Sequence, residues 1–136
     1  MNSATTSLLI ALALFQAKHF LCDFVFQSTW QFRNKGNYGH IAGLIHAGLH
    51  AVTSLPALLV LTGSPALIAV LCLGELVIHY HTDWSKARID ARLGFTEKDW
   101  AYWVIFGADQ FVHQLTYLGM IYVLEAGVLN AVPGLN

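Results

Sequence analysis

Four pairs of histidine and aspartate residues recur along the chain, and the members of each pair are four residues apart. The pairs are His19 with Asp23, His46 with His50, His79 with Asp83, and Asp109 with His113. On an α-helix, residues at this spacing lie on one face. Imidazole and carboxylate groups on neighbouring turns can bind one metal ion together. We therefore predict that these eight residues are the ligands of a metal centre.

The residue types also narrow the choice of metal. Histidine combined with carboxylate suits zinc or iron best, with manganese and nickel as further candidates, whereas magnesium and calcium prefer all-oxygen sites. Eight ligands are more than one tetrahedral ion needs, so the site can hold one or two divalent ions. Two such ions facing three aspartates would leave one positive charge, which a bridging hydroxide would cancel.

Glu75 lies one helical turn from His79 on the same face, and it is surplus to this charge balance. A carboxyl group in that position suits proton transfer, so we predict that Glu75 is the catalytic acid or base. The alternative is that Glu75 contacts one of the metal ligands and does not bind the metal itself. Gln110 and Gln114 are expected to form hydrogen bonds between helices.

The residues between these polar groups are strongly apolar. Of the 136 residues, 56% are hydrophobic and 11% are charged, and the mean hydropathy is +0.54, which is unusual for a soluble domain. Four apolar segments, at 7–27, 39–61, 65–86 and 100–125, are each close to the ~20 residues that cross a bilayer. The formal net charge of −1 gives no reason to expect a nucleic-acid partner.

We therefore expect an all-α, polytopic membrane protein: a four-transmembrane-helix bundle with short connections, forming a single integral membrane domain over residues 1–136. The expected helices are approximately 5–30, 39–61, 65–93 and 97–126, and a short tail follows Gly127. Ser64 is a candidate N-cap with Pro65 after it, and Gly94 is a candidate stop. Pro56 should bend the second helix. Residues 96–99 have the pattern of a capping box.

Positive charges are distributed unevenly between the connections. The first connection, an interfacial segment leading into a short basic loop, carries Arg33 and Lys35, and the third carries Arg88, Arg92 and Lys98. The second connection and both ends of the chain carry none. Because basic loops stay in the cytoplasm, we expect both termini in the periplasm. The eight predicted ligands then lie at similar depths in the cytoplasmic half of the bilayer.

Several of these motifs also resemble those of a known family. The segment 19–27 (HFLCDFVFQ), the His46/His50 pair, His79-x-x-x-Asp83-x-x-Lys86 and Asp109-Gln110-x-x-His113 are similar to the pattern of domain-of-unknown-function family 3307. The similarity covers nearly the whole chain. It implies a compact multi-helix protein of the bacterial inner membrane, of bacterial or phage origin, and it implies no reaction.

The chemistry must therefore come from the predicted site. Our leading hypothesis is an integral membrane metalloprotein that hydrolyses a membrane-associated substrate, with Glu75 or an unused aspartate as the base. A metal-ion or proton transporter is the first alternative, although so small a chain would need a homo-oligomer to build a pathway. A di-iron oxidase or a structural subunit, with the histidines as struts or haem ligands, is the second. Expected partners are the lipid bilayer and a small molecule, lipid or peptide.

Overall fold

The computed structural model describes residues 2–127, and its regular elements over this range are all helices. Its elements are α1 (Ser3–Phe20), η1 (Leu21–Val25), α2 (Thr29–Asn34), α3 (Ile41–Thr53), α4 (Leu55–Leu61), α5 (Pro65–Leu93) and α6 (Trp100–Glu125). The π-helical η1 directly continues α1, and only Ser54 separates α3 from α4. The described chain therefore forms five helical rods. Met1 and the expected tail, residues 128–136, lie outside the described residues.

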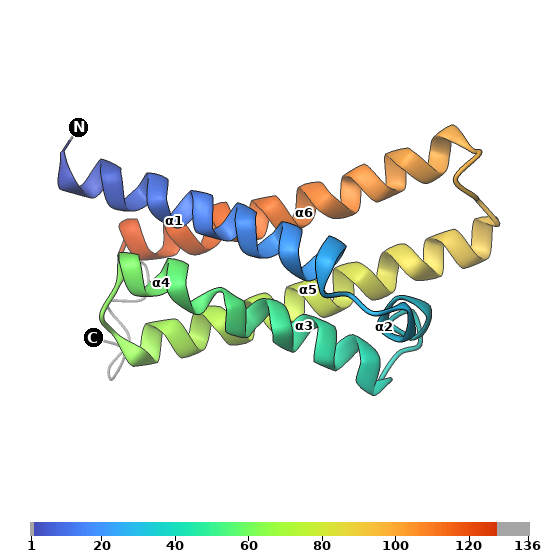
Figure 1. Ribbon diagram of the computed structural model, residues 1–136, viewed down its shortest axis with the longest axis horizontal. Helices are drawn as coiled ribbons and strands as arrows, with labels where there is room; N and C mark the ends of the chain where they lie inside the picture. The colour runs from blue at the N-terminus through green and yellow to red at the C-terminus, as the bar shows by residue number, and fades with distance from the viewer. Residues whose placement is uncertain (1, 128–136) are drawn as a thin grey trace.

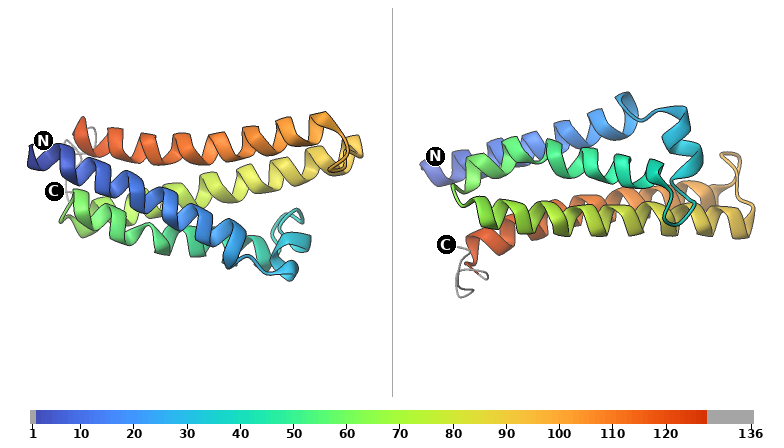
Figure 2. Two further views of the ribbon diagram at one scale, coloured as in Figure 1. Left: turned by 45° about the horizontal axis from the view of Figure 1, so that its top comes forward. Right: turned by 90° about the horizontal axis from the view of Figure 1, so that it is seen from below.

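Four long rods run side by side, and the short α2 crosses one end of them (Figures 1 and 2). α5 packs against α3 and α6, while α1 packs against α4. The rods alternate in direction, so α2 and the α5–α6 connection lie at one end of the bundle. The start of α1, the α4–α5 connection and the end of α6 lie at the other. All the basic connection residues are thus gathered at a single end.

Three helical stretches are long and apolar enough to cross a membrane: Ser3–Val25, Ile41–Leu61 and Pro65–Leu93. These stretches indicate a multi-pass membrane protein. The fourth predicted span, α6, has 26 residues but is not among the three. Asp109, Gln110, His113 and Gln114 in its middle lower its mean hydropathy. Length and composition therefore support three membrane spans. A fourth span at α6 needs separate evidence.

Several predicted helix boundaries agree with the structure. The Ser64 side chain accepts a hydrogen bond from the Leu67 amide, and Pro65 begins α5 as expected. Gly94, with φ of 67°, ends α5 in the left-handed conformation that glycine adopts most easily. Pro56 lies in the first turn of α4 and interrupts the second rod where the bend was predicted.

The first predicted helix ends earlier than expected. Instead of continuing to residue 30, α1 widens into η1, where the Phe26 amide bonds to the Leu21 carbonyl at 2.8 Å. The expected basic loop is then partly helical, because Ser28 and Gln31 form a reciprocal capping box that starts α2. The second predicted helix likewise starts two residues later, at Ile41, because Gly39 has φ of 78°.

The last helix begins at Trp100 rather than at residue 97. The Asp99 carboxylate accepts hydrogen bonds from the amide and the hydroxyl of Thr96, at 2.8 and 3.0 Å. The Thr96 hydroxyl, however, accepts from the Lys98 amide instead of the Asp99 amide. The predicted capping box therefore folds the connection and does not start α6.

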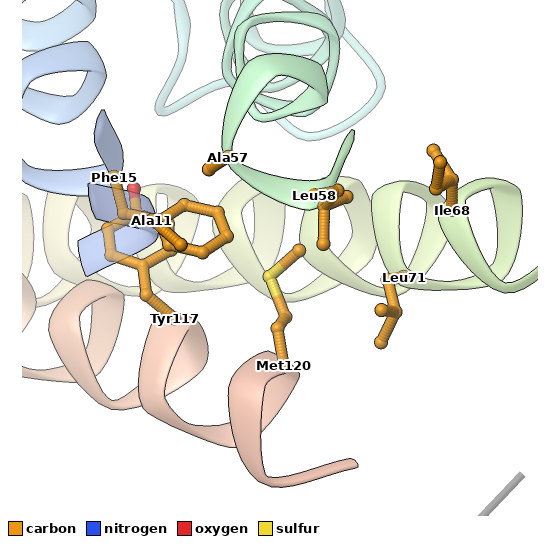
Figure 3. Close-up of a cluster of buried hydrophobic side chains, with 8 residues drawn as sticks. All are labelled: Ala11, Phe15, Ala57, Leu58, Ile68, Leu71, Tyr117 and Met120. Atoms are coloured by element: carbon orange, nitrogen blue, oxygen red, sulfur yellow. The ribbon is translucent and has the colours of Figure 1, made fainter. Parts of the chain in front are cut away.

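The apolar core lies in the half of the bundle away from α2 (Figure 3). Phe15 of α1 stacks on Tyr117 of α6 with ring centroids 5.0 Å apart, and Leu58 of α4 is fully buried beside them. Leu71 and Met120 extend this cluster between α5 and α6. Because this half is filled by apolar side chains, the buried polar residues are concentrated in the other half.

Candidate metal centre

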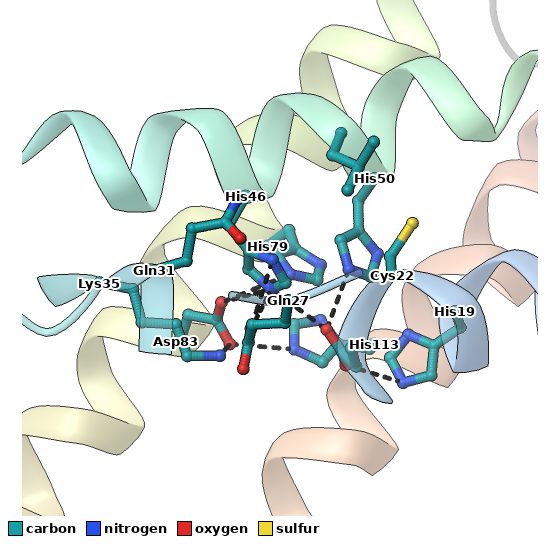
Figure 4. Close-up of polar contacts among 12 residues, drawn as sticks. His19, Cys22, Gln27, Gln31, Lys35, His46, His50, His79, Asp83 and His113 are labelled. Atoms are coloured by element: carbon teal, nitrogen blue, oxygen red, sulfur yellow. Dashed lines mark hydrogen bonds and ion pairs between the residues drawn. The ribbon is translucent and has the colours of Figure 1, made fainter. Parts of the chain in front are cut away.

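Four buried histidines from three of the long rods meet in one layer of the bundle (Figure 4). His46 and His50 come from α3, His79 from α5 and His113 from α6, and each is at most 2% exposed. The His79 ring lies 3.8 Å from that of His50 and 4.1 Å from that of His113, measured between centroids. Four imidazoles in contact and out of reach of solvent need a common partner, since each carries polar nitrogens.

The first group of candidate ligands is formed by Asp23, His46, His50 and His79. One ligand atom from each lies within 4.8 Å of all the others. Asp23 Oδ1 is 3.1 Å from His46 Nε2 and 3.0 Å from His50 Nε2. Asp23 belongs to η1, and both of these histidines belong to α3, so the carboxylate joins the two elements. Three imidazoles and one carboxylate are a complete ligand set for a tetrahedral transition-metal ion.

The second group is formed by His79, Asp83 and His113, again within 4.8 Å of one another. Asp83 Oδ2 lies 3.5 Å from His79 Nε2, and Asp83 Oδ1 lies 3.7 Å from His113 Nε2. Both groups contain His79. Because one imidazole nitrogen binds one ion, the two groups compete for His79 unless its two ring nitrogens are used separately.

The separations of Asp83 from His79 and His113 fit ligands of a common ion, whereas those of Asp23 from His46 and His50 are hydrogen-bond lengths. Two atoms that each lie about 2.1 Å from a tetrahedral ion are about 3.4 Å apart. Hydrogen bonds to nitrogen are shorter, at about 2.7 to 3.2 Å. His79 Nε2, His113 Nε2 and Asp109 Oδ1 are all buried and have no hydrogen-bond partner among the described residues. Two of these atoms, His79 Nε2 and His113 Nε2, belong to the second group, where a cation would satisfy both of them.

His19 lies at the edge of this layer and outside both groups. Its Nδ1 is 3.0 Å from the Tyr117 hydroxyl, and its Nε2 is 2.8 Å from Gln110 Oε1 and 3.3 Å from Asp23 Oδ2. Both ring nitrogens therefore already have partners. In this arrangement His19 supports Asp23 from behind, as outer partners of metal ligands commonly do.

Asp109 also lies outside both groups, although it is next to them. Its Oδ1 is 3.5 Å from His113 Nε2, and its Oδ2 accepts a hydrogen bond from Gln110 Nε2 at 3.2 Å. The structure thus gathers six of the eight predicted ligands into the two groups and places His19 and Asp109 in contact with them.

Lys35 brings a positive charge to the layer from outside the long rods. It caps the end of α2, and its Nζ lies 3.1 Å from Asp83 Oδ1. With neutral histidines, the three aspartates and Lys35 together leave two negative charges. A single divalent cation would neutralise the layer, whereas two would leave it with two positive charges. The charge balance expected from the sequence, with two divalent ions facing three aspartates, did not include Lys35 and is therefore corrected to one ion.

Glu75 lies one layer deeper and is paired with other groups. Its Oε1 forms an ion pair with Lys18, and its Oε2 accepts a hydrogen bond from the Ser54 hydroxyl at 2.5 Å. Lys18 Nζ also lies 3.4 Å from His50 Nδ1 and 3.2 Å from the His50 carbonyl oxygen. Glu75 therefore reaches the layer through Lys18, from the side of His50 opposite Asp23.

A polar cavity of about 270 Å³ opens onto the layer between η1, α2 and α6. Asp23, Asp109 and Gln110 form its floor, and Lys35 and Lys86 line it as well. The side chains of three phenylalanines complete the lining: Phe24, Phe32 and Phe106. A small polar molecule could therefore reach the aspartates from the end of the bundle that carries α2.

Three side chains of the site were not assigned to it from the sequence. Lys35 was placed in a loop, and no local pattern shows that α2 folds back over the bundle. Gln27, whose Nε2 is 3.0 Å from His46 Nε2, follows the polar stripe of the first helix but was given no role. Tyr117 was missed, although it lies four residues after His113 and this spacing could have identified it.

The fold and the site together define a class: an all-helical protein with candidate membrane spans and a buried histidine–aspartate cluster that could hold a metal ion. Within that class, the chain belongs to the family described as Protein of unknown function (DUF3307), whose model matches residues 8–132. The resemblance inferred from the sequence motifs is thereby confirmed. No curated protein and no solved structure matches the chain.

Proposed function

We propose that this protein is a metal-dependent membrane hydrolase whose centre is the layer of Asp23, His46, His50, His79 and Asp83 with His113. The observation that carries the proposal is the pair of buried ring nitrogens, His79 Nε2 and His113 Nε2, which have no hydrogen-bond partner among the described residues and belong to the second ligand group. Zinc or iron suits this donor set best, with manganese or nickel as alternatives. One ion balances the charge of the layer, and a second would require added anions.

In this proposal, the chain forms a single membrane domain with four spans. α6 is the fourth span because it lies along α5 while outward-facing residues such as Phe111, Leu115 and Leu118 remain exposed. Its polar residues face the layer, so they do not meet lipid. The basic connections then place α2 and the cavity at the cytoplasmic side of a bacterial inner membrane, with both termini in the periplasm.

The residues around the cavity can carry out hydrolysis. When bound, a divalent ion would supply a Lewis acid that polarises an ester group of the substrate and lowers the pKa of a bound water molecule. Asp109 is the aspartate outside both ligand groups, and it lines the cavity, so we assign it the role of general base. It takes the proton as the water oxygen bonds to the electrophilic atom of the ester, and it returns the proton to the departing ester oxygen. Lys18 and Glu75 hold His50 in place from behind.

The packing favours an enzyme over a transporter. The cavity reaches the layer from the α2 end, whereas the opposite half of the bundle is filled by the apolar core around Phe15, Leu58 and Tyr117. An ion crossing the membrane would have to pass this core, in which the Tyr117 hydroxyl is the one side-chain oxygen among the eight buried residues of the cluster, too little to replace the ion's hydration. A one-sided cavity is what a membrane hydrolase needs.

Elemental analysis of the detergent-purified protein tests the proposal, with variants of two histidines on α5. His79 belongs to both ligand groups, whereas His81 is exposed and bonds to Tyr38 at 3.2 Å. We expect His79→Ala to abolish bound metal and His81→Ala to keep the stoichiometry of the wild type. A wild-type protein without transition metal, or equal metal content in both variants, would contradict the proposal. Ester hydrolysis that stops on chelation and returns with metal would complete it.

A further inference from the structure

The side chains that line the polar cavity divide into a charged floor and an aromatic wall. Two carboxylates, Asp23 and Asp109, and two ammonium groups, Lys35 and Lys86, line it, so their charges balance. Asp83 and Asp90, which pair with the two lysines at 3.1 and 2.9 Å, are not among the lining residues. Counted together with Asp83 and Asp90, these groups and one divalent ion have no net charge, so an anion would be bound through direct contact with the two ammonium groups that line the cavity.

Asp109 shows that the floor is built to meet a ligand. Asp109 lines the cavity although its side chain is more than nine-tenths buried, and its Oδ1 has no hydrogen-bond partner among the described residues. Lys86 is held in place on another wall, with Nζ 5.0 Å from the centroid of the Tyr102 ring and 5.7 Å from that of Phe106. A volume of about 270 Å³ between these groups suits a headgroup and excludes a folded domain.

The cavity is continuous with an apolar groove on the outside of the bundle. A hollow of about 420 Å³ between α5 and α6 shares Lys86 and Asp109 with the cavity. A second hollow of about 520 Å³ shares Ile78 and Val112 with the first and continues to Val70. Ile78, Val112 and Val70 are all partly exposed. The three hollows therefore follow one another along α5 and α6, with neighbouring hollows sharing lining residues.

The groove is long enough to hold a lipid chain. From Lys86 to Val70 it follows α5 for about 16 residues, or about 24 Å at 1.5 Å per residue. One leaflet of a bilayer contributes about 15 Å of hydrocarbon. A chain that enters beside Lys86 can thus lie along α5 and α6 while its headgroup remains at the cavity.

We propose that the cavity and the groove bind one membrane phospholipid with an anionic headgroup, drawn from the leaflet on the α2 side. The phosphate lies between Lys35, Lys86 and the metal layer, and one acyl chain lies between α5 and α6. This inference rests on the proposed metal centre and names the substrate class of that centre. It places the headgroup esters beside Asp109, the proposed base.

Native mass spectrometry of the metal-loaded, detergent-purified protein tests this inference with dioleoyl phosphatidylglycerol, dioleoyl phosphatidylcholine and inorganic phosphate as probes. We expect one phosphatidylglycerol to bind about tenfold more tightly than phosphatidylcholine, because a charge-assisted contact is lost with the zwitterion. Lys86→Gln should remove this preference. Inorganic phosphate should bind more weakly than phosphatidylglycerol, because it has no chain for the groove.

Two tryptophan variants of α5 test the groove separately. Ile78→Trp fills the point where the two hollows meet, whereas Val77→Trp adds the same ring at a neighbouring exposed position outside both linings. We expect Ile78→Trp to weaken phosphatidylglycerol binding about tenfold and Val77→Trp to leave it unchanged. Equal binding of the two lipids, equal effects of the two tryptophans, or equal binding of inorganic phosphate would overturn the inference.

Metal content measured on the same samples separates the two proposals. A wild-type protein that holds metal but shows no lipid preference overturns the lipid site and leaves the metal centre standing. A wild-type protein without metal overturns the proposed function itself, and with it this inference.

Discussion

Replacing one member of the buried Lys18–Glu75 pair should destabilise the bundle more than replacing both. The side chains are 6% and 1% exposed, so the partner left behind is a charge without solvent. Removing one member of such a pair costs about 3–5 kcal/mol, whereas replacing both with neutral groups is often close to neutral. We expect Lys18→Met and Glu75→Gln each to lose about 3–5 kcal/mol of unfolding free energy, and the double variant to lose much less than their sum.

Detergent-induced unfolding of the purified protein, followed by circular dichroism, gives the four free energies of this double-mutant cycle. Asp90→Asn is the matched control, because it breaks the more exposed Lys86–Asp90 pair, which should contribute about 1 kcal/mol or less. Single variants that each cost under about 1 kcal/mol, or a double variant equal to their sum, would refute the reasoning. The Coulombic coupling would then be absent.

Three further predictions concern the site and the topology. Glu75→Gln should keep the bound metal while hydrolysis falls, because Glu75 reaches the layer only through Lys18; metal loss as complete as in His79→Ala would make Glu75 a ligand. Gly36→Ala should lose about 1–3 kcal/mol of unfolding free energy and weaken metal retention. A Cβ at Gly36 would lie 2.8 Å from the Cβ of Ala87 and would push α2, with Lys35, away from the bundle. Unchanged stability and metal content would contradict this prediction. Reporter fusions at the C-terminus should be active in the periplasm; activity only in the cytoplasm would reverse the orientation.

The sequence predicted the helical rods and the polar layer because both follow from local periodicity. A spacing of four residues places His79 and Asp83 on one face wherever α5 lies in the bundle. Four rods of similar length, joined by short connections, then bring their polar faces to the same depth. Helix ends such as Ser64 and Gly94 were predictable for the same reason, since capping depends on neighbouring residues.

The features that the sequence did not predict depend on tertiary packing. Lys35 reaches Asp83 because α2 folds across the bundle, with Gly36 close to Ala87. η1 also escaped prediction, because a single π-helical turn leaves no distinct pattern in apolar residues. These two features change the chemistry most: Lys35 alters the charge of the layer, and η1 carries Asp23, which joins it to α3.

The composition of α6 has a consequence for how the protein is made. This helix follows the three candidate spans in the chain, and it carries Asp109 and His113 in a segment less apolar than they are. Those three stretches can enter the bilayer on their own hydrophobicity, whereas α6, as the proposed fourth span, would gain a favourable place there only when its polar face meets theirs. Insertion of α6 and closure of the layer are then one event. Substitutions in His46 or His79 should therefore leave α6 outside the membrane during biosynthesis and expose the chain to quality-control proteases.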